Sequence, residues 1–197
     1  MVPAEHFDAE SVVLRRPHLR DLPPAPKLPD GYLLRQVDEA DETALAALLT
    51  AAFAAPQGDA ARRDAWDVAR VRERLIRTPD VRAVYVVERQ GVLVATASSQ
   101  SVPERYPGSG KVHWVGTRPD HQGRGLASAL LARLLVDFAA RGDTDAVLHT
   151  QTYRLPAIRR YFAFGFLPDF DPHGEDHRPR WCAAFQSLFG GNAARKG

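Results

Sequence analysis

The sequence predicts an α/β fold, in which helices and β-strands alternate along one chain. Two observations lead to this prediction. Segments whose apolar residues have helical spacing are separated by short runs rich in valine and other β-forming residues. In the middle of the chain, two such runs are joined by Gln90 and Gly91, as expected for the turn of a hairpin. The expected order is β-α-α-β-β-β-α-β-α-β-β.

The composition indicates one globular domain. A chain of 197 residues can bury a sizeable core, and 45% hydrophobic with 25% charged residues is ordinary for a soluble protein. The net charge of +2, without a basic block, argues against a nucleic-acid partner. Cys182 is the single cysteine, which excludes an internal disulfide and favours a reducing, cytoplasmic location. We expect neither a signal peptide nor a membrane span, because no apolar run is long enough.

The first half of the chain is expected to form an arm, a strand and two helices. Residues 1–30 form the proline-rich arm, with a short strand at Ser11–Leu14, and the domain itself covers 31–190. The strand and helices follow at residues 31–37, 38–55 and 64–78. Asp38 suits the start of the first helix, and Gln57–Ala60 separate the two helices.

The second half is expected to contain most of the sheet and a long helix at residues 125–141. Gly142 is placed to end this helix, whose apolar side consists of Leu126, Leu130, Leu131, Leu134, Leu135 and Phe138. The other expected elements are a hairpin at 81–101, a loop at 106–110, strands at 111–117 and 145–152, a helix at 155–164 ended by Gly165, a short strand near Phe166 and a last strand at 180–188. Residues 191–197 are expected to be a disordered tail.

Two glycines flank an arginine at Gly123, Arg124 and Gly125, directly before the long helix. A helix N-terminus presents unpaired N–H groups and positive partial charge, and glycine lets an anion approach them. The spacing suits a pyrophosphate, although it matches neither a P-loop nor the dinucleotide pattern. A tight turn that needs glycine is the alternative explanation.

With its surroundings, this stretch resembles the GNAT family, the GCN5-related N-acetyltransferases. Gln122, Gly125 and Ala127 match the family signature between a strand and a long helix. In "YFAFGF", Tyr161 stands four residues before a Gly-Phe pair, a second family feature. The resemblance covers residues 31–188. It implies a central mixed β-sheet flanked by helices, and acetyl-CoA as the co-substrate of direct acetyl transfer to a primary amine of a small molecule or protein.

The resemblance also implies a cofactor site. Backbone groups of Val115 and Thr117 would pair with the pantetheine arm and polarise the thioester carbonyl. The CoA pyrophosphate would lie at the helix start, on Gln122, Gly123, Arg124, Gly125 and Ala127. Many members have an asparagine seven residues before the tyrosine, where this chain has Arg154. Arg154 is either a substitute contact to CoA or a solvated side chain.

The two candidate catalytic residues are His113 and Tyr161. An alkylamine with a pKa of about 10.4 costs roughly 4.6 kcal/mol to deprotonate at pH 7, so a base is useful. By strand alternation, Lys111, His113 and Val115 should share one face. Histone acetyltransferases have a glutamate base at the Lys111 position, whereas arylalkylamine acetyltransferases have a histidine at the His113 position.

The resemblance makes Tyr161 the acid that protonates the CoA thiolate. The alternatives are structural. His113 could be a polar strand residue satisfied by a neighbour, and Tyr161 an aromatic residue packed beside Phe162 and Phe164.

A second polar cluster lies at residues 171–181 and contains His173, His177, Asp171, Glu175 and Asp176. It lacks cysteine and the helical spacing of two histidines, so we expect no metal and favour a polar loop beside the acceptor pocket. Two rival functions remain: a non-catalytic acyl-CoA-binding module of the same fold, and an unrelated nucleotide-binding domain. The identity of the amine acceptor and the oligomeric state, including a homodimer, are left open.

Overall fold

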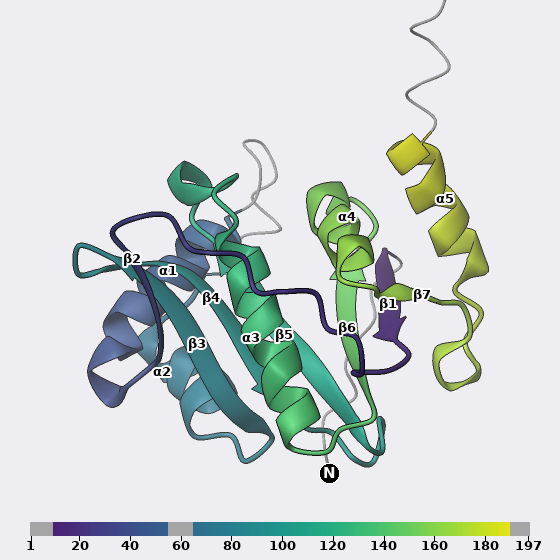
Figure 1. Cartoon of the computed structure of the whole chain (residues 1–197), viewed down its shortest axis with the longest axis horizontal. Helices are drawn as coiled ribbons and strands as arrows, with labels where there is room; N and C mark the ends of the chain where they lie inside the picture. Colours follow the sequence, from purple (N-terminus) through teal and green to yellow (C-terminus); the bar gives the residue numbers. More distant parts are fainter. Residues whose placement is uncertain (1–9, 55–64, 190–197) are drawn as a thin grey trace, which may run out of the picture.

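The protein has a mixed seven-stranded sheet with helices on both faces, in a computed structural model that describes residues 10–54 and 65–189 (Figure 1). The strands are β1 (Ser11–Arg16), β2 (Tyr32–Gln36), β3 (Val81–Arg89), β4 (Val92–Gln100), β5 (Ser109–Thr117), β6 (Asp145–Gln151) and β7 (Leu167–Asp169). The helices are α1 (Glu42–Ala52), α2 (Val68–Val71), α3 (Leu126–Ala140), α4 (Leu155–Ala163) and α5 (Arg178–Phe189). The strand order is β2-β3-β4-β5-β6-β1-β7, and only β5 and β6 are parallel neighbours among the described strands. The expected mixed sheet is confirmed.

The predicted hairpin forms β3 and β4. Gln90 and Gly91, between the two strands, have φ values of 51° and 77°. Positive φ at both central positions is the conformation of a type I′ turn, whose twist matches that of the strands it joins. The hairpin is extended on one side by β2 and on the other by β5.

Each face of the sheet carries its own helices, because side chains of successive strand residues point to opposite faces. On β3, Tyr85 and Val87 pack in the core cluster of α3, whereas Val84 and Val86 pack in the cluster of α1 and α2. The predicted apolar side of α3 is confirmed, since none of its six residues is more than 1% exposed. Gly142 ends the helix with a left-handed φ of 83°.

Gly110 in β5 lies directly beneath α3. A Cβ atom at this position would lie 2.4 Å from the Phe138 ring, and Phe138 is fully buried. We expect Gly110→Ala to lower the free energy of unfolding by about 2–3 kcal/mol, because overpacking forces the ring or the strand to move. Urea unfolding measures the loss. Combining it with Phe138→Leu should recover part of the stability, and additive losses would show that the two residues do not clash.

The arm contributes a strand to the interior of the sheet. The predicted strand at Ser11–Leu14 is confirmed and continues to Arg16. It pairs antiparallel with β6 on one side and β7 on the other, and Val12, Val13 and Leu14 are fully buried. A segment expected beside the domain therefore forms part of its sheet.

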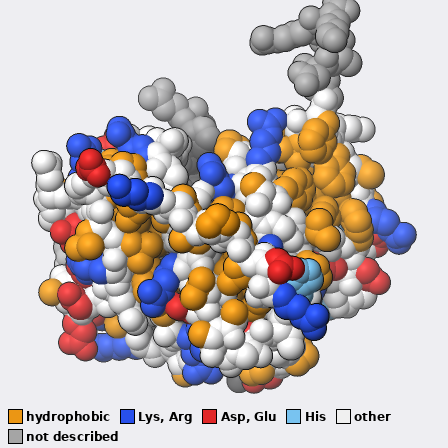
Figure 2. All heavy atoms as spheres, viewed as in Figure 1, with side chains coloured by type: hydrophobic (Ala, Val, Ile, Leu, Met, Phe, Trp, Pro, Cys, Tyr) orange, Lys and Arg blue, Asp and Glu red, His pale blue; other side chains and the backbone are white. Residues whose placement is uncertain are grey.

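The expected last strand at 180–188 is wrong, because this segment belongs to helix α5. Its buried residues Trp181, Ala184 and Leu188 have the three- and four-residue spacing of one helix face. In the structure β7 is the last strand of the sheet, and this segment packs as a helix against β1 and α4. Phe189 is 65% exposed, and Figure 2 shows hydrophobic side chains gathered over this helix.

The helices before the hairpin begin later than expected. A 3₁₀ turn at Glu39–Asp41 precedes α1, and Asp38 forms a capping box with Asp41. The second expected helix starts only at Val68, and a π-helical turn at Arg72–Ile76 continues it. The expected break at 57–60 and the tail at 191–197 lie outside the described residues. Of the helices in the described ranges, none combines the length and apolar character needed to cross a membrane.

Candidate active site

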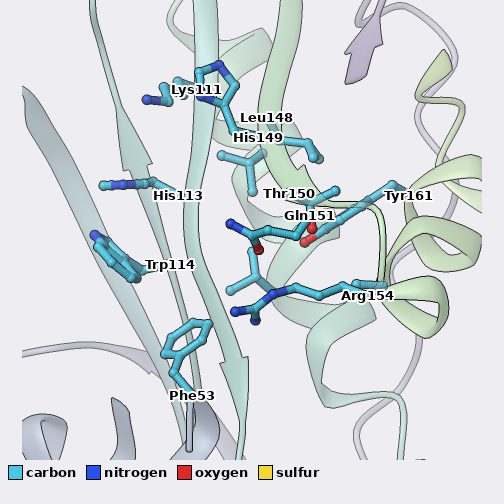
Figure 3. A pocket seen from close by; sticks show the side chains of 13 residues that line it. Phe53, Lys111, His113, Trp114, Leu148, His149, Thr150, Gln151, Arg154 and Tyr161 are labelled. Atoms are coloured by element: carbon cyan, nitrogen blue, oxygen red, sulfur yellow. The ribbon is translucent and has the colours of Figure 1, made fainter. Parts of the chain in front are cut away.

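A cavity opens where β5 and β6 separate. The two strands pair only from Ser109 opposite Asp145 to Val112 opposite Leu148. Beyond this point a cavity of about 240 Å³ lies between them (Figure 3). Its lining consists of Phe53, Lys111, Val112, His113, Trp114, Val115, Leu148, His149, Thr150, Gln151, Arg154, Ala157 and Tyr161. The cavity therefore brings together four residues that the sequence predicts for the site: His113, Val115, Arg154 and Tyr161.

A β-bulge in β5 shapes one wall of the cavity. Thr96 of β4 lies opposite Gly116, but Ser98 lies opposite His113, so β5 has one extra residue between these pairs. The extra residue is accommodated at Trp114, whose φ of 46° is left-handed. The hydroxyl of Ser98 donates a hydrogen bond to the His113 carbonyl at 2.9 Å, which holds the strand beside the bulge.

The bulge interrupts the alternation of side chains along β5. Trp114 packs against Phe53 and Trp66 on the face of α1 and α2, with ring centroids 5.5 and 4.6 Å away. Val115 packs on the opposite face, in the core cluster of α3. The expectation that Val115 shares a face with Lys111 and His113 is therefore wrong.

His113 lies on the cavity wall, half-buried between the sheet and the α1 side (Figure 3). Its ring centroid is 4.9 Å from that of Trp114, with the planes tilted by 45°. This aromatic contact and the bulge orient the imidazole on the side of the sheet away from α3.

Tyr161 lines the opposite wall of the cavity, and Figure 3 shows the His113 side chain pointing away from it, on the other side of β5. Its ring, on α4, is 7% exposed and packs edge-on against Phe166, with centroids 6.0 Å apart. Figure 3 shows the hydroxyl pointing from α4 into the space beside β6. Burial raises the pKa of this phenol to about 12, against the opposing effect of the Arg154 charge. The hydroxyl therefore keeps its proton at neutral pH and can donate it.

The glycine turn lies past the end of β5 and leads into α3. Gly123 and Gly125 have φ values of 74° and 79°, which explains why glycine stands at both positions. A Cβ atom at either residue would meet open space, so no packing within the described protein requires the missing side chains. Gly125 is the N-cap of α3 and provides no capping side chain, which leaves the first N–H groups of the helix for a ligand.

The remaining predicted cofactor residues surround this turn. The Gln122 amide donates to the carbonyl of Thr117, at the end of β5, over 3.4 Å. Arg124 is exposed and reaches the Asp120 carbonyl at 3.4 Å. Ala127 lies in the first turn of α3. These side chains lie at the α3 end of the site, whereas Arg154 lies in the cavity.

Two polar residues that the sequence pattern does not predict, Tyr106 and His149, form a pair beside the cavity. The Tyr106 hydroxyl is 2.6 Å from Nε2 of His149, which lines the cavity on β6. The Tyr106 ring also lies 4.7 Å from the His173 ring, so the segments 101–110 and 171–180 meet here. Burial lowers the pKa of His173, and the charge of Arg105 lowers it further. The polar loop at 171–181 was expected beside the acceptor pocket, but its contact with Tyr106 could not be read from spacing.

The second polar cluster is held together by its own charges. Arg180 forms an ion pair with Glu175 at 2.7 Å and lies 2.8 Å from Nε2 of the fully buried His177. The segment that contains this cluster connects β7 to α5, whereas the expected last strand would have made it a connection between two strands. Within the described ranges, no three histidine, cysteine or acidic side chains are grouped closely enough to hold a metal ion.

Comparison with known proteins agrees with the fold. The model of the acetyltransferase (GNAT) family matches residues 43–166. Mycothiol acetyltransferases from Streptomyces bingchenggensis and Streptomyces coelicolor are 35% and 32% identical over 73% and 78% of this chain. The chain spans 45% and 48% of the length of these relatives, about half of each.

Solved structures of the same fold include a GCN5-related N-acetyltransferase from Sphaerobacter thermophilus. It is 25% identical, with a TM-score of 0.61 over 81% of this chain and 48% of that one. The PaiA N-acetyltransferase from Thermoplasma acidophilum, solved in complex with coenzyme A, is 12% identical, with a TM-score of 0.60 over 74% and 94% of the two chains. From the family match, the fold and these relatives together, the chain belongs to the GNAT family of acetyltransferases.

Proposed function

We propose that the protein transfers an acetyl group from acetyl-CoA directly to a primary amine. The observation that carries this proposal is the continuity of β5, the glycine turn and α3. This single stretch provides an anion site at the open helix start and, along β5, one wall of a cavity that faces Tyr161. A pyrophosphate site and a thioester site at the two ends of this stretch match the two groups of acetyl-CoA that its pantetheine arm connects.

In this proposal the cofactor lies along β5. The pyrophosphate binds the N–H groups of the turn from Gln122 to Gly125 and the first turn of α3 at Ala127, and Arg124 adds a positive charge. The backbone of Val115 and Thr117 pairs with the pantetheine arm. The end of β5 does not pair with β6, which supports this role because its polar groups on that side are available for a ligand.

The chemistry needs two proton transfers. His113 accepts a proton from the incoming ammonium, directly or through water, and the neutral nitrogen attacks the thioester carbon. Backbone N–H groups of β5 stabilise the negative oxygen that forms. The C–S bond then breaks, Tyr161 gives its proton to the CoA thiolate, and the nitrogen loses its second proton to solvent. Solvent then returns a proton to Tyr161 and takes the proton from His113, so that one proton is released for each acetyl group transferred. The products are the acetamide and the free thiol.

The identity of the acceptor amine has to be found by testing many amines. A panel of primary amines should be incubated with acetyl-CoA, and thiol release measured. The panel includes deacetylated mycothiol, because the relatives are named for mycothiol, as well as amino acids and an amine-bearing peptide. Acceptor-dependent thiol release supports acetyl transfer, and tight CoA binding without release for any amine contradicts it.

The pyrophosphate position makes a direct prediction for Gly125→Val. Acetyl-CoA should raise the melting temperature of the wild type, and this shift should disappear in the variant because the valine side chain occupies the phosphate position. The left-handed φ of residue 125 costs the variant about 1–2 kcal/mol of stability by itself.

Gly142→Val is the matched control for this prediction, since Gly142 has a φ of 83° and open space at the opposite end of α3. It should lose similar stability but keep the acetyl-CoA shift. A folded Gly125→Val protein with an undiminished shift would place the pyrophosphate elsewhere.

A further inference from the structure

Arg154 holds a positive charge inside the cavity. It precedes α4, and Figure 3 shows its side chain extending from α4 toward Phe53 of the α1 side. Its guanidinium carbon lies 5.2 Å from the centre of the Phe53 ring and 5.6 Å from that of Tyr153. These contacts with aromatic rings hold the cation in place without neutralising its charge.

In the part of the chain that the structure describes, this guanidinium has no ion-pair partner. Its Nε atom is buried and has no hydrogen-bond partner. Other partly buried arginines are ion-paired: Arg15 with Asp145 at 2.8 Å, and Arg35 with Glu88 at 2.9 Å. Arg16 also has a buried Nε atom without a partner, but its other two nitrogens donate to backbone carbonyls. A buried donor without a partner is costly, so the arrangement at Arg154 points to a ligand.

We propose that the acceptor amine carries a carboxylate or phosphate group close to its nitrogen, and that Arg154 binds this anion. The inference rests on the proposed acetyl transfer to an amine. A planar guanidinium matches such a group, because two parallel N–H donors can meet two oxygens. The cation–π contact uses the face of the guanidinium, which leaves the donors at its edge for the anion.

The position of Arg154 favours the acceptor over the cofactor. The CoA pyrophosphate is assigned to the start of α3, and the pantetheine arm that would enter the cavity is uncharged. Among the described residues that line the cavity, none is an aspartate or glutamate. An anion bound at Arg154 would therefore come with the second substrate. Arg154 is also close enough to act electrostatically on Tyr161, so the anion would lie near the reacting amine.

Matched pairs of acceptors test the proposal. We would compare each L-amino acid with its carboxamide, and phosphoethanolamine with ethanolamine, by kcat/KM with acetyl-CoA. An anionic neighbour raises the pKa of an amine, so an enzyme without anion recognition should prefer the neutral partner of each pair. We expect the anionic partner to be preferred at least 10-fold, and the two kinds of pair distinguish carboxylate from phosphate. Equal rates, or a preference for the neutral partners in every pair, would overturn the proposal.

Variants of Arg154 test whether this residue causes the preference for anionic acceptors. Arg154→Met should lower kcat/KM for the anionic acceptor by roughly 10- to 100-fold, the scale of a hydrogen bond to a charged group, and leave the neutral partner little changed. Arg154→Lys should recover only part of the lost kcat/KM, because lysine lacks the planar fork of N–H donors. Arg20→Met removes an exposed charge outside the cavity and should leave kcat/KM unchanged for both the anionic and the neutral acceptor. If Arg154→Met instead weakens acetyl-CoA binding and leaves the acceptor preference intact, Arg154 belongs to the cofactor site and the inference is wrong.

A binding measurement separates this inference from the proposed function. Calorimetry on the CoA-loaded protein compares the two members of each pair without needing turnover. Tighter binding of an anionic amine that depends on Arg154, without acetylation of any amine, would support the anion site and contradict acetyl transfer. Failure of every anionic amine to bind more tightly than its neutral partner would overturn the anion site, whatever the catalytic result.

Discussion

Replacing Tyr161 with phenylalanine is expected to lower kcat by about 10²- to 10³-fold, with little change in acetyl-CoA affinity. The phenylalanine ring keeps the packing against Phe166, so the fold and the cavity should survive. What is lost is the proton donor for the departing thiolate, which acts in the transition state and not in the bound ground state. The pKa of about 12 places this proton on the oxygen throughout the neutral range.

The measurement is single-turnover acetyl transfer, together with the dissociation constant of acetyl-CoA. Because the Tyr161 pKa is so high, the wild type should show no loss of activity from Tyr161 ionisation below about pH 10. Tyr153→Phe is the matched control, since it removes a hydroxyl from a 44% exposed residue that does not line the cavity. An unchanged single-turnover rate for Tyr161→Phe would reduce Tyr161 to a packing residue.

Replacing His113 with alanine is expected to lower kcat/KM by about 10²-fold and to remove the rise of activity with pH. A base must be unprotonated to accept a proton, so wild-type kcat/KM should increase with pH across the range in which histidines commonly titrate. His113→Gln should be nearly as slow, because glutamine keeps the polarity without the basicity. The same acceptor must be used throughout, since the amine's own ionisation also produces a rising limb.

Two further variants decide which histidine is responsible. His18→Gln changes an exposed histidine outside the cavity and should leave the profile unaltered. His149→Gln tests the other histidine of the cavity wall, which is 2.6 Å from the Tyr106 hydroxyl. If the rising limb persists in both His113 variants but is lost in His149→Gln, the base is His149 and the assignment of His113 is wrong.

Local signals along the chain predict most of the secondary structure. The apolar side of α3 is continuous over the helix, so its periodicity could be read directly, and the turn at Gln90 and Gly91 determines the register of β3 and β4. The segment at 180–188 could not be resolved this way, because a short apolar run suits a strand and a helix equally well. In the structure the segment is a helix that packs against β1, which comes from the other end of the chain, and against α4.

For the candidate site, the sequence alone predicted the glycine turn, the tyrosine on α4 and the histidine on β5, because each stands in a short segment that could be compared with the family pattern. Tertiary structure decided where they lie relative to one another. The bulge at Trp114 depends on the pairing of β5 with β4 and moves Val115 to the other face of the sheet. The contact of Arg154 with Phe53 joins residues about a hundred positions apart, and such long-range contacts leave no periodicity in the sequence.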